Sequence, residues 1–184
     1  MKEFPKKIAI SGGVSNGKTS LIKYIEQQGY VVVPEVSRNI INTNTAIDSD
    51  ILPWKNVDAF EKACFKGQIF AEKKINSLDT EFVFLDRCMV DLASFYQVRN
   101  VPVPKNVWKH IEKSDYYFIF CLEPLTSFEK DKIRIEDEIT AKKLYEVNLE
   151  NCNKYFPKKT ITLPPVSIQA RYNIIIQTIN NRQA

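Results

Sequence analysis

The feature that most constrains this chain is a glycine-rich run close to its start. Residues 12–19 read GGVSNGKT and match the pattern G-x-x-x-x-G-K-[ST]. Residues 7–11, which read KIAIS, predict a short buried strand before this run, and residues 20–26 after it carry apolar side chains on one helical face. This order of strand, glycine-rich turn and helix predicts a loop that binds phosphate groups. An ordinary glycine-rich turn, the alternative, needs neither the Lys-Thr pair nor this spacing.

The predicted loop binds anions mainly through its main chain. Glycine is needed where the backbone approaches a polyphosphate, because a Cβ atom would block the approach or forbid the required dihedral angles. Successive N–H groups then point inward, and the N-terminus of the following helix adds the positive end of its dipole. We expect Lys18 to reach the β- and γ-phosphates of ATP and the Thr19 hydroxyl to ligate Mg²⁺. The predicted nucleotide-binding residues are Gly12, Gly13, Val14, Ser15, Asn16, Gly17, Lys18, Thr19 and Ser20.

The composition is that of an ordinary globular protein. The 184 residues, 44% hydrophobic and 26% charged, suit a single domain over residues 1–184. The formal net charge of +4 is modest and the two signs are mixed, so we do not expect a nucleic-acid-binding face. Four separated cysteines and one histidine provide no zinc-site spacing. No apolar run approaches the roughly 20 residues needed to cross a bilayer, and we expect a cytoplasmic protein.

Apolar segments typical of strands alternate with helical segments along the rest of the chain. Strands that are apolar on both faces and alternate with helices predict an α/β fold of three layers, in which a five-stranded parallel sheet has helices on both faces. Right-handed crossovers bring the carboxyl ends of all the strands to one edge, where ligands bind. Further strands are predicted at residues 30–33, 82–85, 116–121 and 160–163, helices at 57–78, 90–98, 137–155 and after Ser167, and a long loop at 42–56.

Acidic residues follow two of the predicted strands directly. Asp86 and Arg87 come after the strand at 82–85, where an aspartate helps to hold Mg²⁺. Glu35 follows the strand at 30–33, and we expect it to act as a general base toward an acceptor hydroxyl or as an outer Mg²⁺ ligand. Arg38, one helical turn further on, is expected to hold the acceptor together with Glu35 and Arg87. Helix capping by these carboxylates is the alternative interpretation.

A charge-dense segment at residues 129–136 lies between two predicted helices. A basic segment that closes over the triphosphate would exclude water and place Lys132 or Arg134 against the charge that develops in phosphoryl transfer. We therefore predict a helical lid at about residues 125–140, with a solvated helix face as the alternative. The predicted catalytic residues are Lys18, Glu35, Asp86, Arg87 and Arg134, the metal ligands Thr19 and Asp86, and the substrate-binding residues Glu35, Arg38 and Arg87.

Several motifs of other nucleotide-binding proteins are missing from the chain. No second carboxylate follows Asp86, so the acidic pair of motor-type ATPases is absent. There is no N-K-x-D run and no D-x-x-G after the strand at 82–85, which disfavours a signalling GTPase. The single histidine, His110, is poorly placed for catalysis, so no Ser-His-Asp set can be assembled.

With these motifs the chain resembles the P-loop nucleoside and nucleotide kinases. More narrowly, it is similar to the NadR-like AAA-type ATPase and kinase family, which includes ribosylnicotinamide kinase domains. The similar runs are the phosphate loop, VVPEVSR at 32–38, FLDR at 84–87 with the aromatic pair at 95–96, and LPPVS at 163–167 leading to Arg171. The resemblance implies a P-loop NTPase fold, ATP and Mg²⁺ as cofactors, and a lid that carries Lys132 and Arg134.

Three functions are compatible with these residues. The leading hypothesis is a Mg²⁺-dependent kinase that transfers the γ-phosphoryl group of ATP to a small, nucleoside-like acceptor. The alternative is a regulatory ATP- or GTP-binding switch whose loop at 42–56 reorders with nucleotide and recruits a partner. A nucleic-acid end kinase is the third, and it would need a basic groove. The sequence leaves the acceptor and the oligomeric state open.

Overall fold

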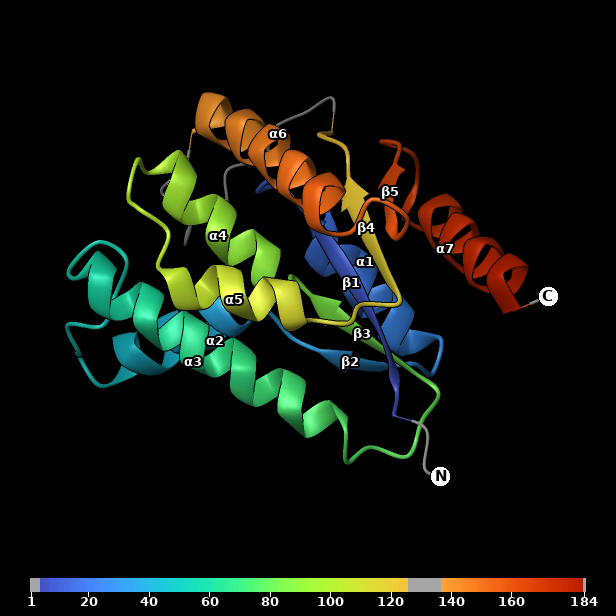
Figure 1. The fold of residues 1–184 in the computed structure, drawn as a ribbon, viewed down its shortest axis with the longest axis horizontal. Coiled ribbons are helices and arrows are strands. Elements are labelled where there is room, and N and C mark those ends of the chain that lie inside the picture. The colour runs from blue at the N-terminus through green and yellow to red at the C-terminus, as the bar shows by residue number, and fades with distance from the viewer. Residues whose placement is uncertain (1–3, 126–136, 184) are drawn as a thin grey trace.

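A five-stranded parallel sheet forms the middle layer of the molecule (Figure 1). The computed structural model describes residues 4–125 and 137–183. The strand order is β2-β3-β1-β4-β5, so the strand that enters the phosphate loop lies at the centre of the sheet. The strands are β1 (Lys6–Gly12), β2 (Val31–Val33), β3 (Phe82–Asp86), β4 (Phe118–Leu122) and β5 (Thr160–Leu163).

Helices cover both faces of the sheet, which confirms the predicted three-layer P-loop fold. Alternation along β1 sends Ile8 and Ile10 toward one face and Ala9 toward the other, and both sets are fully buried. The first face is covered by α1 (Lys18–Gln27) and α7 (Ile168–Gln183). The second face is covered by α3 (Val57–Ile75), α4 (Met89–Val98), α5 (Lys105–Lys113) and α6 (Glu138–Tyr155), with α2 (Val36–Ala46) packed on α3.

The prediction of a long loop at residues 42–56 is wrong over its first part. Helix α2 continues through this polar sequence to Ala46, and only residues 47–56 connect it to α3. Asn and Thr are poor helix formers in isolation. Here Ile40 and Ile41 pack against the buried cluster of α3 and α4, and this tertiary contact outweighs local propensity. Other helix and strand ends differ from the predicted ones by a few residues.

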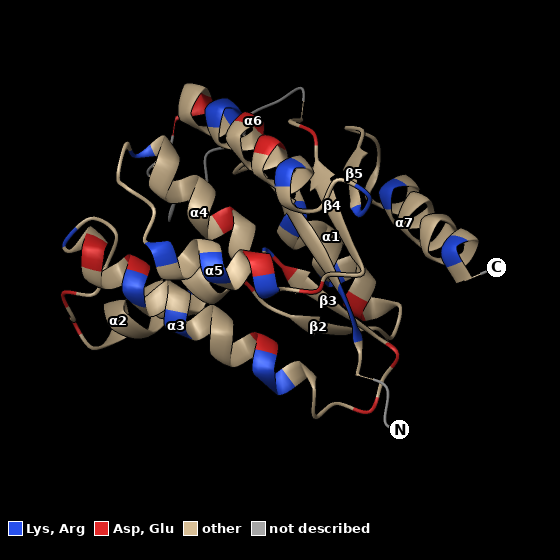
Figure 2. Ribbon diagram, in the orientation of Figure 1, with Lys and Arg blue, Asp and Glu red and all other residues tan. Residues whose placement is uncertain are grey.

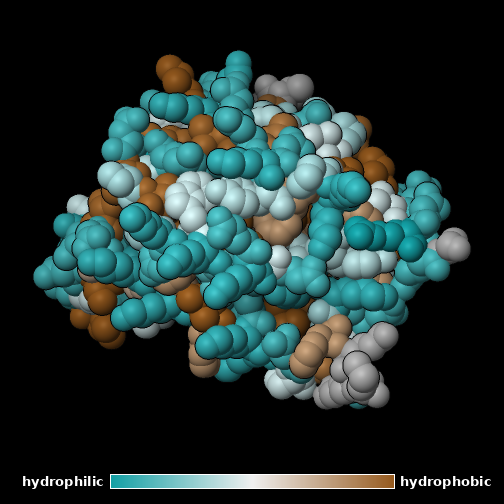
Figure 3. Space-filling model, viewed as in Figure 1, coloured by the Kyte–Doolittle hydropathy of each residue, from teal (hydrophilic) through white to brown (hydrophobic). Residues whose placement is uncertain are grey.

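Charged side chains of both signs are interspersed over the helices that face the viewer in Figure 2. The same face is largely hydrophilic in Figure 3, with apolar side chains in small groups. Within residues 4–125 and 137–183, no helix combines the length and the apolar character needed to cross a membrane.

Close packing of α2 on α3 depends on a glycine. A Cβ atom added to Gly67 would lie 2.6 Å from Cγ1 of Val36, a β-branched side chain with little freedom to move. Val36 directly follows Glu35, one of the predicted site residues. The contact between α2 and α3 therefore also helps to position Glu35.

We predict that Gly67→Ala lowers the free energy of unfolding by about 1–2 kcal/mol, because overpacking outweighs the gain in helix propensity. In a Val36→Ala background the obstructing methyl is gone, and the same substitution should stabilise the protein by about 0.5–1 kcal/mol. Urea denaturation of the wild type, the two single variants and the double variant measures both effects. Stabilisation by Gly67→Ala in the wild-type background would contradict the packing argument.

Candidate functional site

The glycine-rich loop connects the end of β1 to the start of α1 at the carboxyl edge of the sheet. Gly12 and Gly17 have φ values of +124° and +82°, a region that L side chains rarely adopt. A Cβ atom on Gly12 would also lie 2.8 Å from the carbonyl oxygen of Leu122 on β4. Both glycines are therefore required by the backbone path, and the first turn of α1 points its unpaired N–H groups into the loop.

Lys18, the first residue of α1, folds back over this loop. Its side chain is 3% exposed, and its ammonium group donates a hydrogen bond to the carbonyl oxygen of Gly13. Burial and the neighbouring Arg87 guanidinium lower the pKa of Lys18 to about 7, although Asp86 acts in the opposite direction. Within the part of the chain that the structure describes, the desolvated ammonium group thus donates to one neutral acceptor, with carboxylates acting on it through space. A polyphosphate in the loop would favour its charged form.

Thr19 and Asp86 form the part of the site that suits a divalent cation. The Thr19 hydroxyl donates to Asp86 Oδ2 at 3.2 Å, while Asp86 Oδ1 is buried without a hydrogen-bond partner in the described residues. Burial and the charge of Glu35 raise the pKa of Asp86. A buried, unpartnered carboxylate oxygen beside a hydroxyl is a hard donor set that fits Mg²⁺ completed by phosphate oxygens and water. These residues fit the predicted metal.

Arg87 links the loop to the neighbouring strand edge. Its backbone has φ +75° and extends the sheet by donating from N to the Ile10 carbonyl at 3.0 Å. Its guanidinium donates to Glu35 Oε1 at 2.8 Å, to the Gly12 carbonyl at 3.2 Å and to Asp91 Oδ1 at 3.1 Å. A non-glycine residue with this backbone conformation costs about 1 kcal/mol or more in strain. The charged hydrogen bonds of the guanidinium stabilise Arg87 in this conformation and fix its position.

Glu35 is the second carboxylate of this group. Burial opposes its ionisation, but the Arg87 guanidinium and the hydrogen bond from Ser37, 2.7 Å long, lower its pKa to about 2. Arg38 lies 3.7 Å away on the other carboxylate oxygen, one turn along α2. The carboxylate is therefore ionised at neutral pH and accepts hydrogen bonds from Ser37 and Arg87. The same geometry shows that Glu35 also begins α2, as its N-terminal flanking residue.

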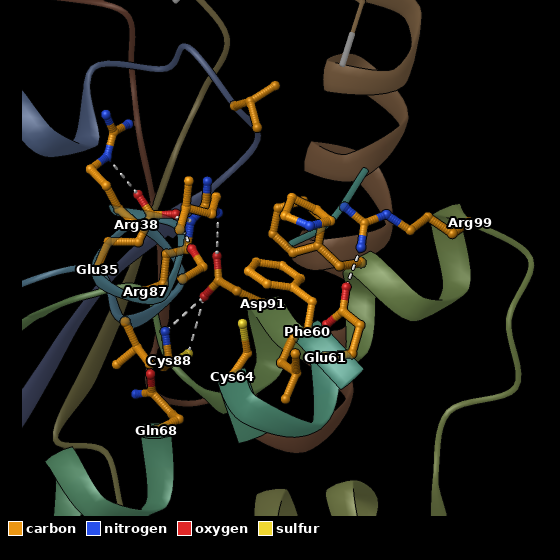
Figure 4. A pocket seen from close by; sticks show the side chains of 17 residues that line it. Glu35, Arg38, Phe60, Glu61, Cys64, Gln68, Arg87, Cys88, Asp91 and Arg99 are labelled. Atoms are coloured by element: carbon orange, nitrogen blue, oxygen red, sulfur yellow. Dashed lines mark hydrogen bonds and ion pairs between the residues drawn. The ribbon is translucent and has the colours of Figure 1, made fainter. Parts of the chain in front are cut away.

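A cleft opens beside the phosphate loop between α2, α3 and α4, and Figure 4 shows its lining side chains. Glu35, Arg38 and Arg87 lie together at one end. Phe95 also lines the cleft, and its ring centroid lies 5.2 Å from Cζ of Arg87 and 5.3 Å from Cζ of Arg99. The walls are apolar, and further lining residues are Val14, Ile41, Phe60, Cys64, Cys88 and Leu92.

Sequence reasoning missed two residues that shape the cleft. Asp91, 2% exposed, holds Arg87 through Oδ1 and caps α4 by accepting from the Cys88 N–H through Oδ2 at 2.9 Å. The D-R-x-x-x-D spacing, with Arg and Asp four apart, was its available signal. Gln68 lines the cleft, and its amide nitrogen donates to the buried Glu72 at 3.0 Å. No sequence pattern indicates Gln68, because its partner Glu72 resembles any charged helical residue.

The structure brings Lys18, Thr19, Asp86, Glu35 and Arg87 into one cluster, with Arg38 at its rim. The side chain of Asn16 contacts β4 and not a phosphate position, because it donates to the Leu122 carbonyl at 2.7 Å. The predicted lid residues Lys132 and Arg134 lie outside the described residues, as does most of the lid at 125–140.

Comparisons with known proteins agree with this architecture. The family model described as AAA domain matches residues 7–171. A search of curated proteins finds no match. The solved structures that match include NadR protein in complex with NR, at 19% identity and a TM-score of 0.65; the match covers 87% of this chain but 46% of NadR, so this chain spans less than half of that protein.

Two further structures are similar over nearly their whole length. Deoxyadenosine kinase from M. mycoides with bound dATP has 18% identity, a TM-score of 0.62 and coverage of 95% of this chain and 99% of that one. Thymidylate kinase from Candida albicans has 14% identity, a TM-score of 0.72 and coverage of 100% and 94%. These likenesses establish the fold, and the match over residues 7–171 shows that the chain belongs to the AAA domain family, with the P-loop kinase-like architecture that the sequence resembles.

Proposed function

We propose that the protein is an ATP-dependent kinase that phosphorylates a hydroxyl group of a small, nucleoside-like molecule. One observation carries the proposal: a cleft adjoins the phosphate loop, and Arg87 connects the two. Its guanidinium donates to the Gly12 carbonyl in the loop and to the Glu35 carboxylate in the cleft. A protein that only binds or hydrolyses a nucleotide needs no second pocket beside the γ-phosphate position. Similarity in fold to deoxyadenosine kinase and thymidylate kinase supports the same class of reaction.

The phosphoryl donor is assigned to the loop. The main-chain N–H groups of residues 13–19 hold the phosphate oxygens, and Lys18 leaves the Gly13 carbonyl to neutralise charge on the β- and γ-phosphates. Thr19 and Asp86 would hold Mg²⁺, which supplies electrostatic stabilisation of the transferring group. Arg134 is assigned to the lid and would add a further cation to that charge.

The acceptor is assigned to the cleft, with its hydroxyl at Glu35. A carboxylate with a pKa near 2 is a weak base, but the loose transition state of phosphoryl transfer demands little activation of the nucleophile. We therefore assign Glu35 to accepting a hydrogen bond from the hydroxyl, orienting it and taking its proton late in the reaction. Arg87 fixes the Glu35 carboxylate, and Arg38 lies where it would contact the acceptor.

The alternative is a nucleotide-dependent switch whose loop at residues 42–56 reorders with nucleotide. Helix α2 continues to Ala46, so the segment outside helices is shorter than that alternative expected and covers residues 47–56. Nucleotide binding followed by slow hydrolysis, with no acceptor phosphorylated, would nevertheless favour it over a kinase.

The first test is ADP release from ATP or GTP in the presence of nucleosides, nucleotides and ribosylated vitamins. We predict turnover with a nucleoside-like acceptor, and a loss of at least about 100-fold in kcat for Lys18→Ala, typical of removing one group that stabilises developing charge. Lys23→Ala, an exposed lysine on the same helix, is the matched control and should keep full activity. Equal turnover by the Lys18 variant would refute the assignment.

A second variant separates metal binding from nucleotide binding. Asp86→Asn keeps the shape of the side chain but removes its charge, so we expect Mg²⁺-dependent turnover to fall about 10- to 100-fold. Affinity for ATP without Mg²⁺ should stay the same or rise, because a carboxylate no longer faces the phosphates. Titrations of Mg²⁺ and of metal-free ATP measure the two effects, and an unchanged Mg²⁺ requirement would contradict the role of Asp86.

The pKa of Lys18 predicts coupling between nucleotide binding and protonation. At pH 8.5 most of the Lys18 ammonium is deprotonated in the free protein, since its pKa is about 7. A bound polyphosphate raises that pKa, so binding takes up nearly one proton and affinity falls up to tenfold per pH unit above pH 7. Calorimetry in two buffers of different ionisation enthalpy measures the uptake. Lys18→Arg should show none, and zero uptake by the wild type would count against the prediction.

A further inference from the structure

A buried guanidinium group contacts the phosphate loop from α7, which covers the sheet face opposite to the helices that line the cleft. It belongs to Arg171 in the first turn of α7 and is 2% exposed. Its nitrogens donate to main-chain carbonyl oxygens of three segments: Asn16 in the loop at 2.7 Å, Glu123 after β4 at 3.3 Å and Pro164 after β5 at 2.8 Å. One side chain therefore joins three segments that meet at the carboxyl edge of the sheet.

The contact with the loop determines the orientation of a peptide group. All described peptide bonds are trans, so the Asn16 carbonyl and the Gly17 N–H point in opposite directions. Because Arg171 holds this carbonyl on its own side, the Gly17 N–H is turned away from Arg171. Gly17 lies close against the same guanidinium, since a Cβ atom on it would be 3.3 Å from Arg171 Nη1. The guanidinium thus supports the loop at its second glycine.

The charge of Arg171 is not neutralised by an ion pair within residues 4–125 and 137–183; its partners are neutral carbonyl groups. Burial lowers the pKa of Arg171, and the Glu123 carboxylate acts in the opposite direction, so it offsets part of the cost of burying this cation. Asn16 reinforces the arrangement, because its side chain ties the same loop residue to the Leu122 carbonyl on β4. The loop backbone is therefore held by a buried cation that forms no ion pair within the described residues.

We propose that Arg171 is a positioning residue for the phosphoryl donor. It fixes the peptide between Asn16 and Gly17 with its N–H toward the phosphates, and its charge adds to the attraction of a polyphosphate. This inference rests on the proposed nucleotide binding by the loop. It differs from the proposed catalytic roles because Arg171 touches the loop backbone and not the reacting groups.

The test uses Mg²⁺ tripolyphosphate, which carries the phosphate chain without ribose or base, beside Mg²⁺ ATP. We expect Arg171→Met to weaken both ligands by a similar factor of about 10 to 100, the range seen when a group that orients ligand-binding atoms is removed. Arg171→Lys keeps the charge but replaces the planar guanidinium with a single nitrogen, which cannot reach all three carbonyls in the same geometry. Its affinities should lie between those of the wild type and of Arg171→Met. Arg182→Met is the matched control: this exposed arginine of α7 donates to the Tyr117 carbonyl, and its removal should leave both affinities unchanged.

Circular dichroism and thermal unfolding separate this role from loss of fold. If Arg171→Met does not fold, the Arg171→Lys variant decides. A folded Arg171 variant with wild-type affinity for tripolyphosphate overturns the inference. So does a variant that loses affinity for ATP alone, because the effect would then lie at the turn after β5 and not at the phosphate loop. Failure of the wild type to bind either ligand would instead remove the proposed function. In the kinase assay the KM for ATP should rise while the KM for the acceptor stays the same.

Discussion

Compensation among buried charges is the interaction on which this site depends. Lys18 and Arg87 lie within electrostatic reach of Glu35, Asp86 and Asp91 at the carboxyl edge of the sheet. Each of these charges is costly in the interior unless the others offset it. The sheet makes the cluster possible, because its register places Ile10 beside Asp86 and Val33 beside Leu85, so that residues just after three strands converge. Arg87 joins the two halves, the loop and the cleft.

The sequence was sufficient for the fold because its signals were local and mutually consistent. Apolar strands, a loop with two obligatory glycines and amphipathic helices each specify the same layered sheet. The prediction from the sequence was wrong at α2, where Asn and Thr residues suggested a loop. Ile40 and Ile41 of this helix pack against the buried cluster of α3 and α4. That helix is stabilised by a contact with a segment far along the chain, through Gly67, and no local pattern reports such a contact.

Site residues that directly follow a strand could be predicted from the sequence. Site residues that lie on helices and hold other side chains could not. Lys18, Glu35, Asp86 and Arg87 stand at positions that the topology brings together, which the pattern of strands anticipated. Asp91 and Gln68 reach the cleft from helix faces, and the contacts that fix them are side chain to side chain. Their identity depends on which helix faces pack together, information that appears only in the folded chain.

A crystal structure with Mg²⁺ and a non-hydrolysable ATP analogue tests polyphosphate binding by the loop most directly. We predict phosphate oxygens within hydrogen-bond distance of the N–H groups of residues 13–19, with the Lys18 ammonium transferred from the Gly13 carbonyl to the β- and γ-phosphates and a metal ion on Thr19. A polyphosphate bound elsewhere, or Lys18 still on the Gly13 carbonyl with the nucleotide in place, would contradict it.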